Sequence, residues 1–145
     1  GDRSRLSIRV ADGLFSAETL TANNTKLVLN VCFNYGGRWD ICQAAESLRK
    51  SGQAITEEAL GKSLALAHVP DPDLFIRTGG ELRVSNFLIW QMAYAEFYFS
   101  PVLWPDFNAQ ELDQAITVFR SRERRFGQTS EQLVGAAHGM KPGDA

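Results

Sequence analysis

The chain has 145 residues, of which 44% are hydrophobic, and a formal net charge of −2. These values fit one folded domain, exclude an intrinsically disordered chain and give no reason to expect bulk nucleic-acid binding. No apolar run approaches the length of about 20 residues that a membrane-spanning helix needs, and no signal-peptide pattern opens the chain. We therefore expect a cytoplasmic protein. Because Cys32 and Cys42 lie among apolar residues and lack Cys-x-x-Cys spacing, we expect reduced core cysteines rather than a disulfide or a zinc site.

The first predicted elements are a helix and a strand. Apolar residues recur at helical spacing from about Ser7 to Ala22, and the polar residues that follow predict the end of that helix. The run from Lys26 to Phe33 is almost continuously apolar and of strand length, which is typical of a strand buried on both faces of a parallel sheet. Gly1 to Arg5 has the composition of a loop, so we expect the natural chain to begin earlier.

A loop with paired glycines, Asn34 to Arg38, follows that strand and precedes a helix predicted from about Trp39 to Lys50. Two interpretations of the loop stay open. It is an anion site at the carboxyl end of a strand, or a structural turn whose glycines only adopt positive φ. Asp40 could simply stabilise the start of the helix. A further helix is predicted from Thr56, as its N-cap, to about Ala67.

The stretch from Leu74 to Asn86 has the features of an anion-binding loop. A short apolar run predicts a strand, paired glycines predict a tight loop, and a Ser-Asn cap precedes an apolar helix expected from about Asn86 to Ala95. The guanidinium forks of Arg77 and Arg83 suit phosphate or carboxylate oxygens. In the alternative interpretation, both arginines pair with Glu81 and other acids on a solvated loop.

Glu96 separates the apolar helix from a short aromatic strand, Phe97 to Phe99. A carboxylate there is costly to bury unless a cation, a metal or hydrogen-bond donors accompany it. Alternatively it stands in solvent or pairs with a structural arginine. We expect the aromatics of Val102 to Phe107 to pack under the sheet, a helix from Ala109 to Phe126, and a polar, mobile tail from Gln128 to Ala145.

Several common chemistries lack their motifs in this sequence. Neither the P-loop pattern Gly-Lys-Ser/Thr nor the dinucleotide pattern Gly-x-Gly-x-x-Gly occurs, which argues against ATP and NAD. The nucleophile elbow Gly-x-Ser-x-Gly is also missing, which argues against that hydrolase class. What remains is an anion grip by arginine and a candidate acid at Glu96.

The order and spacing of these motifs resemble the cis-prenyltransferase family, and within it the bacterial undecaprenyl diphosphate synthases. The resemblance is carried by Asn30, Asn34–Arg38, Ile76–Gln91, Ala93–Phe99, Leu103–Phe107 and Arg122–Gly127. It implies an α/β fold with a mostly parallel central sheet flanked by helices. Residues 1–127 would form the C-terminal portion of a single domain whose N-terminal part is absent here, followed by the tail at 128–145.

The resemblance also implies an activity. Members of this family condense isopentenyl diphosphate onto farnesyl diphosphate with Mg²⁺, giving undecaprenyl diphosphate, the lipid carrier for peptidoglycan synthesis. It implies a cytoplasmic homodimer that binds no nucleic acid and contacts the membrane through its lipid product. The absent N-terminal part would carry an aspartate loop and much of the product tunnel, so we expect this chain alone to be inactive. A noncatalytic partner subunit of the same fold and an unrelated phosphate-binding α/β domain remain alternatives.

Site residues follow from the resemblance, position by position. The diphosphate of isopentenyl diphosphate would be held by Arg77, Arg83 and Ser85, and Asn34 would also bind substrate. Glu96 matches the acid at the magnesium site, and Glu81 would orient the arginines. An Arg-x-Gly motif that reaches into the partner subunit's site is matched by Arg125 and Gly127. Leu82 departs from the pattern, because some relatives have histidine there, so no acid role is carried over to it.

Overall fold

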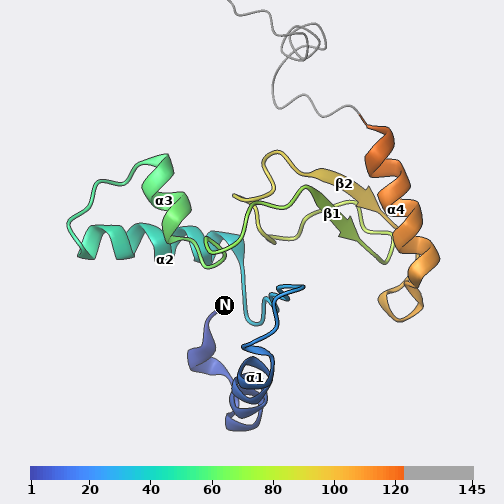
Figure 1. Cartoon of the computed structure of the whole chain (residues 1–145). Coiled ribbons are helices and arrows are strands. Elements are labelled where there is room, and N and C mark those ends of the chain that lie inside the picture. Colours follow the sequence, from blue (N-terminus) through green and yellow to red (C-terminus); the bar gives the residue numbers. More distant parts are fainter. Residues whose placement is uncertain (123–145) are drawn as a thin grey trace, which may run out of the picture. The chain divides into compact units, whose positions relative to one another are not determined.

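The structure is a computed structural model that describes residues 1–122. The chain divides into two compact units. The first unit comprises Gly1–Asp71 and Val84–Gln91, and the second comprises Pro72–Arg83 and the chain from Met92 onward. Residues 84–91 therefore belong to the first unit although the segments on either side of them belong to the second. Figure 1 shows the elements of both units in sequence colours.

The second unit is built on two parallel strands, β1 (Leu74–Arg77) and β2 (Glu96–Phe99), which pair from Leu74 opposite Glu96 to Arg77 opposite Phe99. β1 contains Phe75 and Ile76, and β2 is aromatic from Phe97 to Phe99, as the pleated, half-buried surface of a sheet favours. The rings of Phe75 and Phe97 lie directly across the pair, with centroids 5.3 Å apart. Both predicted strands are thereby confirmed.

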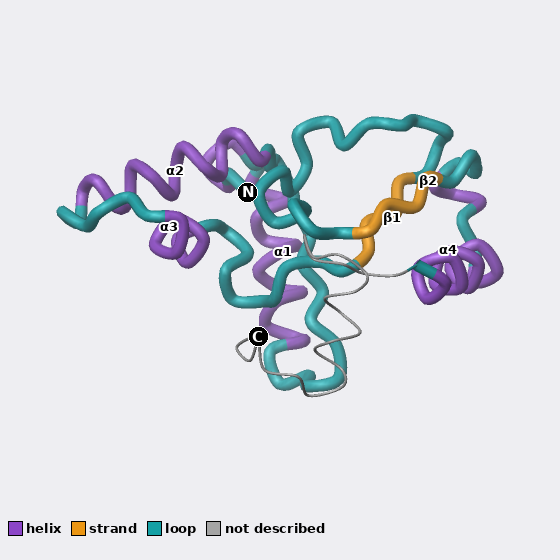
Figure 2. Tube along the Cα trace, turned by 90° about the horizontal axis from the view of Figure 1, so that it is seen from above, coloured by secondary structure: helices purple, strands orange, loops and turns teal. Residues whose placement is uncertain are grey.

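Helix α4 (Ala109–Ser121) contacts β2, as Figures 1 and 2 show. The side chain of Asn108 caps it by accepting from the backbone N–H groups of its first turn, at 2.9 and 3.2 Å. Ala115 of this helix is fully buried. The buried hydroxyl of Ser100 donates to Glu111 Oε2 at 3.0 Å, which ties the end of β2 to α4. A helix packed on a parallel strand pair confirms the predicted α/β class.

The core of the first unit lies between α2 (Gly37–Lys50) and α3 (Glu57–Ser63). Apolar side chains at helical spacing meet there; the buried members are Ala44, Leu48, Leu60 and Leu64. Thr56 caps α3 by accepting from the Ala59 N–H at 3.1 Å, as predicted. The helix ends at Ser63 rather than Ala67. Cys42 of α2 is exposed, so its predicted place in the core was wrong, and Cys32 is half-buried.

Helix α1 (Ile8–Thr21) matches its predicted range but buries none of its residues. The short helix η1 (Arg3–Arg5) precedes it. The predicted strand from Lys26 to Phe33 is wrong: the segment is irregular and largely exposed, Leu29 to 79%. A strand needs the backbone of a partner, and none of residues 1–122 pairs with this segment in a sheet.

The helix predicted from Asn86 to Ala95 is also wrong, because that stretch forms a series of turns. Positive φ angles at Ser85 (47°), Asn86 (63°) and Leu88 (44°) lie in the left-handed region and are incompatible with a right-handed helix. No helix in the described part of the chain is both long and apolar enough to cross a membrane.

Three predictions near the C-terminus were wrong or lie outside the described residues. Trp104 lies in the short helix η2 (Trp104–Asp106) and does not pack under the sheet, because it is 75% exposed. Its ring stacks on that of Phe107, with ring centroids 6.2 Å apart. α4 ends at Ser121 rather than Phe126. The predicted tail lies outside the described residues.

Candidate diphosphate site

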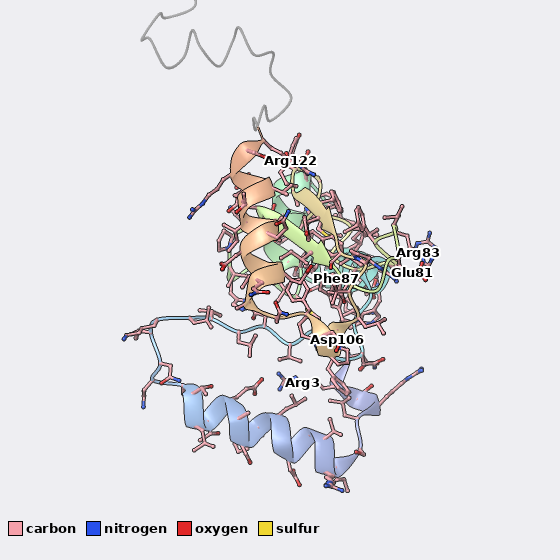
Figure 3. The ribbon with its side chains drawn as sticks, turned by 90° about the vertical axis from the view of Figure 1, so that its right-hand side faces the viewer. Arg3, Glu81, Arg83, Phe87, Asp106 and Arg122 are labelled. Atoms are coloured by element: carbon pink, nitrogen blue, oxygen red, sulfur yellow. The ribbon has the colours of Figure 1, made fainter. Side chains whose placement is uncertain are left out.

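Residues 77–83 of the second unit, here called the arginine loop, hold the two arginines predicted to bind an anion. Arg77 ends β1, and its Nη1 donates to the backbone oxygen of Arg83 at 2.6 Å. The guanidinium of Arg83 forms an ion pair with Glu81. The Arg83 side chain is 64% exposed and that of Glu81 45% exposed, and Figure 3 shows the two at the rim of the ribbon. The pairing considered as the alternative for Arg83 is therefore present, in a position open to solvent.

The paired glycines give the arginine loop its shape rather than free N–H donors. Gly79 and Gly80 have φ of 87° and 73°, a conformation that side-chain-bearing residues rarely adopt. Their N–H groups donate to Val102 O at 2.8 Å and to Ser100 O at 3.0 Å. Because these donors are occupied and no helix begins after the loop, the predicted anion binding would have to rest on the arginine side chains. The predicted contribution of a helix start was wrong.

Glu96 begins β2 and pairs with Arg122, the residue that follows α4. Arg122 Nη1 donates to Glu96 Oε2 at 2.8 Å and to the backbone oxygen of Phe97 at 3.0 Å. The Glu96 side chain is 27% exposed and that of Arg122 41% exposed. The alternative considered for Glu96, pairing with a structural arginine, is therefore present. The sequence did not identify the partner as Arg122, which is labelled at the end of α4 in Figure 3. Its signal was the basic end of a helix, but no local pattern connects it to a carboxylate 26 positions away.

The donor set around Glu96 decides whether a magnesium ion fits there. No group of three or more His, Cys, Asp or Glu side chains that could enclose an ion exists among residues 1–122. Mg²⁺, however, is commonly bound by one or two carboxylates together with substrate phosphates and water. A single carboxylate at Glu96 fits that shared mode and does not fit an all-protein cage.

The second glycine loop, in the first unit, is closed by the protein itself. At the start of α2, the Gly37 N–H donates to Asn86 O at 2.7 Å and the Arg38 N–H donates to Asn86 Oδ1 at 2.9 Å. Gly36 has a φ of −153°, so positive φ is not the reason for the glycine there. A Cβ on Gly36 would lie 2.7 Å from Asn86 Nδ2. Close approach explains the glycine, and the contacts favour the structural interpretation of this loop.

Asp40, whose role the sequence left open, is a buried acceptor in the first unit. It accepts from the hydroxyl of Tyr35 at 2.8 Å and from the Ala65 N–H at 2.9 Å. Burial raises the pKa of Tyr35, and the hydrogen bond to Asp40 raises it further. Asp40 thus joins α2 to the segment after α3, beyond any effect on the helix start.

The remaining predicted residues are either in the first unit or outside the described residues. Asn34 belongs to the first unit, where its Nδ2 donates to Asp2 O at 2.9 Å. Ser85 is exposed and also belongs to the first unit. Arg125 and Gly127 lie outside the described residues. The structure therefore brings together Arg77, Glu81 and Arg83, places Glu96 in the same unit, and leaves the other assignments as predictions.

Comparison with known sequences shows the family to which the chain belongs. A family model described as "Putative undecaprenyl diphosphate synthase" matches residues 1–127. An isoprenyl transferase of Neisseria meningitidis serogroup B is 58% identical over 134 residues, covering 92% of this chain and 54% of the relative. A ditrans,polycis-undecaprenyl-diphosphate synthase of Vibrio vulnificus, farnesyl-diphosphate specific, is 51% identical over 140 residues, covering 92% and 56%. The chain thus spans about half the length of the curated relatives it matches.

Solved structures agree with the sequence comparison. A probable undecaprenyl diphosphate synthase from Campylobacter jejuni superposes with a TM-score of 0.81 at 39% identity, covering 88% of this chain and 61% of that one. Lavandulyl diphosphate synthase from Lavandula x intermedia, in complex with dimethylallyl diphosphate, gives 0.83 at 37% identity, covering 88% and 58%. By sequence and by structure, the chain belongs to the undecaprenyl diphosphate synthase family of cis-prenyltransferases.

Proposed function

We propose that the protein containing this chain elongates cis-prenyl chains by condensing isopentenyl diphosphate onto farnesyl diphosphate, with undecaprenyl diphosphate as the product. Family membership supports the reaction class, and the name of the Vibrio vulnificus relative supports the farnesyl substrate. The single observation that carries the proposal is the arginine loop. There Arg77 donates a hydrogen bond to the backbone oxygen of Arg83, and Arg83 forms a solvent-exposed ion pair with Glu81.

Arg83 is the residue best prepared to receive a diphosphate. An exposed ion pair such as that with Glu81 contributes about 0–1 kcal/mol, so a multiply charged anion can compete for the guanidinium. A bidentate contact to phosphate oxygens is stronger and more directional than a contact to a single charge. Glu81 would hold Arg83 extended before substrate arrives and so acts as an orienting residue. Arg77 contributes a second guanidinium, and Ser85 a hydroxyl donor.

Glu96 would hold a magnesium ion through one carboxylate, with Arg122 maintaining its orientation. When bound, the ion supplies positive charge that stabilises the diphosphate leaving group as the allylic carbon–oxygen bond breaks. The chain's own contribution is placement: arginines fix the diphosphate of isopentenyl diphosphate, which in turn fixes its double bond near the allylic carbon. The described residues do not identify a base for the final proton loss.

The whole reaction needs more than this chain in the proposed scheme. We infer that the allylic substrate is gripped by a segment outside these 145 residues, because the chain spans 54% of the Neisseria meningitidis relative. The active form would be a homodimer to which Arg125 and Gly127 contribute across the interface. It would work in the cytoplasm, supply a lipid carrier for peptidoglycan synthesis and touch the membrane through its product.

A chimera tests the proposal. The chain replaces the matching segment of the Neisseria meningitidis isoprenyl transferase, and incorporation of radiolabelled isopentenyl diphosphate is measured with farnesyl diphosphate and Mg²⁺. We expect long-chain labelled product from the chimera and none from the 145-residue chain alone. A cooperatively folded chimera that binds isopentenyl diphosphate without condensing it would indicate a noncatalytic subunit. A folded chimera that does not bind it would refute the diphosphate site.

A further inference from the structure

We propose that Asn86 is a positioning residue for substrate binding, because it anchors residues 84–91, here called the Asn86 turn, to the start of α2. The inference rests on the proposed function, in which Ser85 of this turn contacts the diphosphate. All contacts that carry it lie within the first unit. It assigns a role to a residue that the motif analysis treated only as the cap of a helix.

The anchor consists of two hydrogen bonds that Asn86 accepts from consecutive residues. Gly37 donates its N–H to the backbone oxygen at 2.7 Å, and Arg38 donates its N–H to Oδ1 at 2.9 Å. The first N–H groups of a helix have no partner within the helix, and a capping side chain usually supplies one. Gly36, the N-cap position of α2, makes no side-chain hydrogen bond. Asn86 therefore takes the place of the local cap from 48 positions away.

Gly36 and Gly37, at the start of α2, leave room for the Asn86 turn because they have no side chain. A Cβ on Gly36 would lie 2.7 Å from Asn86 Nδ2, and a Cβ on Gly37 would lie 2.6 Å from Ile89 Cγ1. Both distances are shorter than a Cβ atom tolerates. The Asn86 turn therefore packs directly against the backbone of the two glycines. In this proposal, the glycines serve to allow that close packing.

The backbone of the Asn86 turn needs such support. Ser85, Asn86 and Leu88 all have positive φ, and only asparagine among these three residue types is common in that region. A strained backbone persists only when its surroundings hold it in place. Because Ser85 immediately precedes the anchored residue, the hydrogen bonds of Asn86 set the backbone conformation from which the Ser85 hydroxyl extends.

The anchor also explains why the start of α2 is not the anion site. Two N–H groups at the start of α2 already donate to neutral oxygen atoms of Asn86. These groups at the positive end of the helix are therefore not available to an anion. Ser85 immediately precedes Asn86, so it lies next to a helix start whose first N–H groups Asn86 already occupies. The role of α2 in this arrangement is to hold the turn, and recognition of the anion remains with the arginines and Ser85.

The anchor itself can be measured in the 145-residue chain by amide hydrogen exchange. Asn86→Gly tolerates positive φ and keeps the backbone oxygen, but it removes Oδ1. We expect the Arg38 amide to exchange at least about tenfold faster while the Gly37 amide remains protected, and Asn86→Asp to restore protection of Arg38, because Oδ1 returns. Unchanged exchange at Arg38 in Asn86→Gly would overturn the anchor.

The positioning role is measured in the chimera by steady-state kinetics. We expect Asn86→Gly to raise the KM for isopentenyl diphosphate about tenfold, to leave the KM for farnesyl diphosphate unchanged, and Asn86→Asp to recover most of the loss. Asn108→Gly is the matched control, since it removes the side-chain cap of α4 and should lower Tm without changing either KM. A merely structural role would lower the active fraction and leave both KM values alone.

Gly36→Ala disturbs the anchor from the other side, because its Cβ meets Asn86 Nδ2, and it should raise the same KM. Gly13→Ala is its control, because a Cβ there meets nothing within 4 Å. An unchanged KM for isopentenyl diphosphate in both Asn86→Gly and Gly36→Ala would overturn the positioning role alone. A wild-type chimera without condensation would instead overturn the proposed function, and with it this role.

Discussion

Arg122 donates from Nη1 to Glu96 Oε2 at 2.8 Å, so the carboxylate assigned to the metal already has a cationic partner. The same nitrogen donates to the backbone oxygen of Phe97 at 3.0 Å, which fixes the guanidinium on β2. The pair joins the first residue of β2 to the residue after α4. It orients the Glu96 carboxylate, and both side chains remain partly open to solvent.

Removing Arg122 should therefore have a small effect on stability. We expect Arg122→Ala to lower the free energy of unfolding by about 0.5–1 kcal/mol, because partly exposed ion pairs contribute little. Urea denaturation measures this, with Arg120→Ala at the end of the same helix as the control. In a double-mutant cycle with Glu96→Ala, which removes the acceptor, a coupling energy near zero would contradict the pair as a stabilising contact.

Glu96→Gln should separate catalysis from folding. The substitution keeps the shape and a hydrogen-bond acceptor for Arg122 but removes the charge that a magnesium ion requires. We expect the chimera carrying it to lose at least about 100-fold in turnover and to show a weakened dependence on Mg²⁺ concentration, with Tm close to wild type. Glu46→Gln, a surface acid of α2, is the control. Normal turnover with normal magnesium dependence in Glu96→Gln would remove Glu96 from the metal site.

Arg83→Ala should weaken binding of isopentenyl diphosphate by about 1.5–3 kcal/mol, which is roughly a tenfold to hundredfold change in Kd. Arg83→Lys should fall between wild type and alanine, because it keeps the charge and loses the fork. Isothermal titration of the chimera measures the change. Arg49→Ala removes a comparable surface ion pair with Glu46 and should leave Kd unchanged. Identical titrations for wild type and Arg83→Ala would contradict the assignment.

Tyr35 gives the first unit a predictable response to alkaline pH. Its pKa is raised because burial disfavours the phenolate, and because its hydroxyl donates to the Asp40 carboxylate. The folded state therefore holds this proton more tightly than the unfolded state, in which a tyrosine has a pKa of about 10. The resulting stability is present below about pH 10 and is lost as the pH rises toward the folded-state pKa.

Two measurements check the response of Tyr35. The phenolate absorbance of the folded protein should differ little between wild type and Tyr35→Phe from pH 9 to 11, since Tyr35 stays protonated. The loss of unfolding free energy above pH 10 should be shallower in Tyr35→Phe. If the wild-type protein showed the absorbance of one more phenolate than Tyr35→Phe near pH 10, the pKa of Tyr35 would not be raised.

Local patterns predicted the helices with clear periodicity and the two strands that find a partner. The ranges of α1 and α2, and strands β1 and β2, followed from apolar periodicity, glycine positions and aromatic runs. The run from Lys26 to Phe33 carries the same kind of signal but lacks a partner strand among the described residues. An apolar run specifies only that a strand is favourable, and its formation depends on a neighbouring backbone.

Long-range contacts account for the parts that the sequence could not predict. The apolar run after Asn86 looks helical, but Asn86 bonds to Gly37 and Arg38 and the run forms turns instead. The pairing of Arg122 with Glu96 likewise depends on how α4 packs on β2. Among the site residues, the Arg83 pairing with Glu81 was foreseeable, because only one position separates them.

The most direct test of the central claim is incorporation of radiolabelled isopentenyl diphosphate by three chimeras: wild type, Arg77→Ala and Arg83→Ala. If the arginine loop holds the diphosphate in a condensing enzyme, the wild-type chimera makes labelled long-chain product, and each substitution reduces incorporation at limiting isopentenyl diphosphate by at least about tenfold. Equal incorporation by all three chimeras would contradict the account.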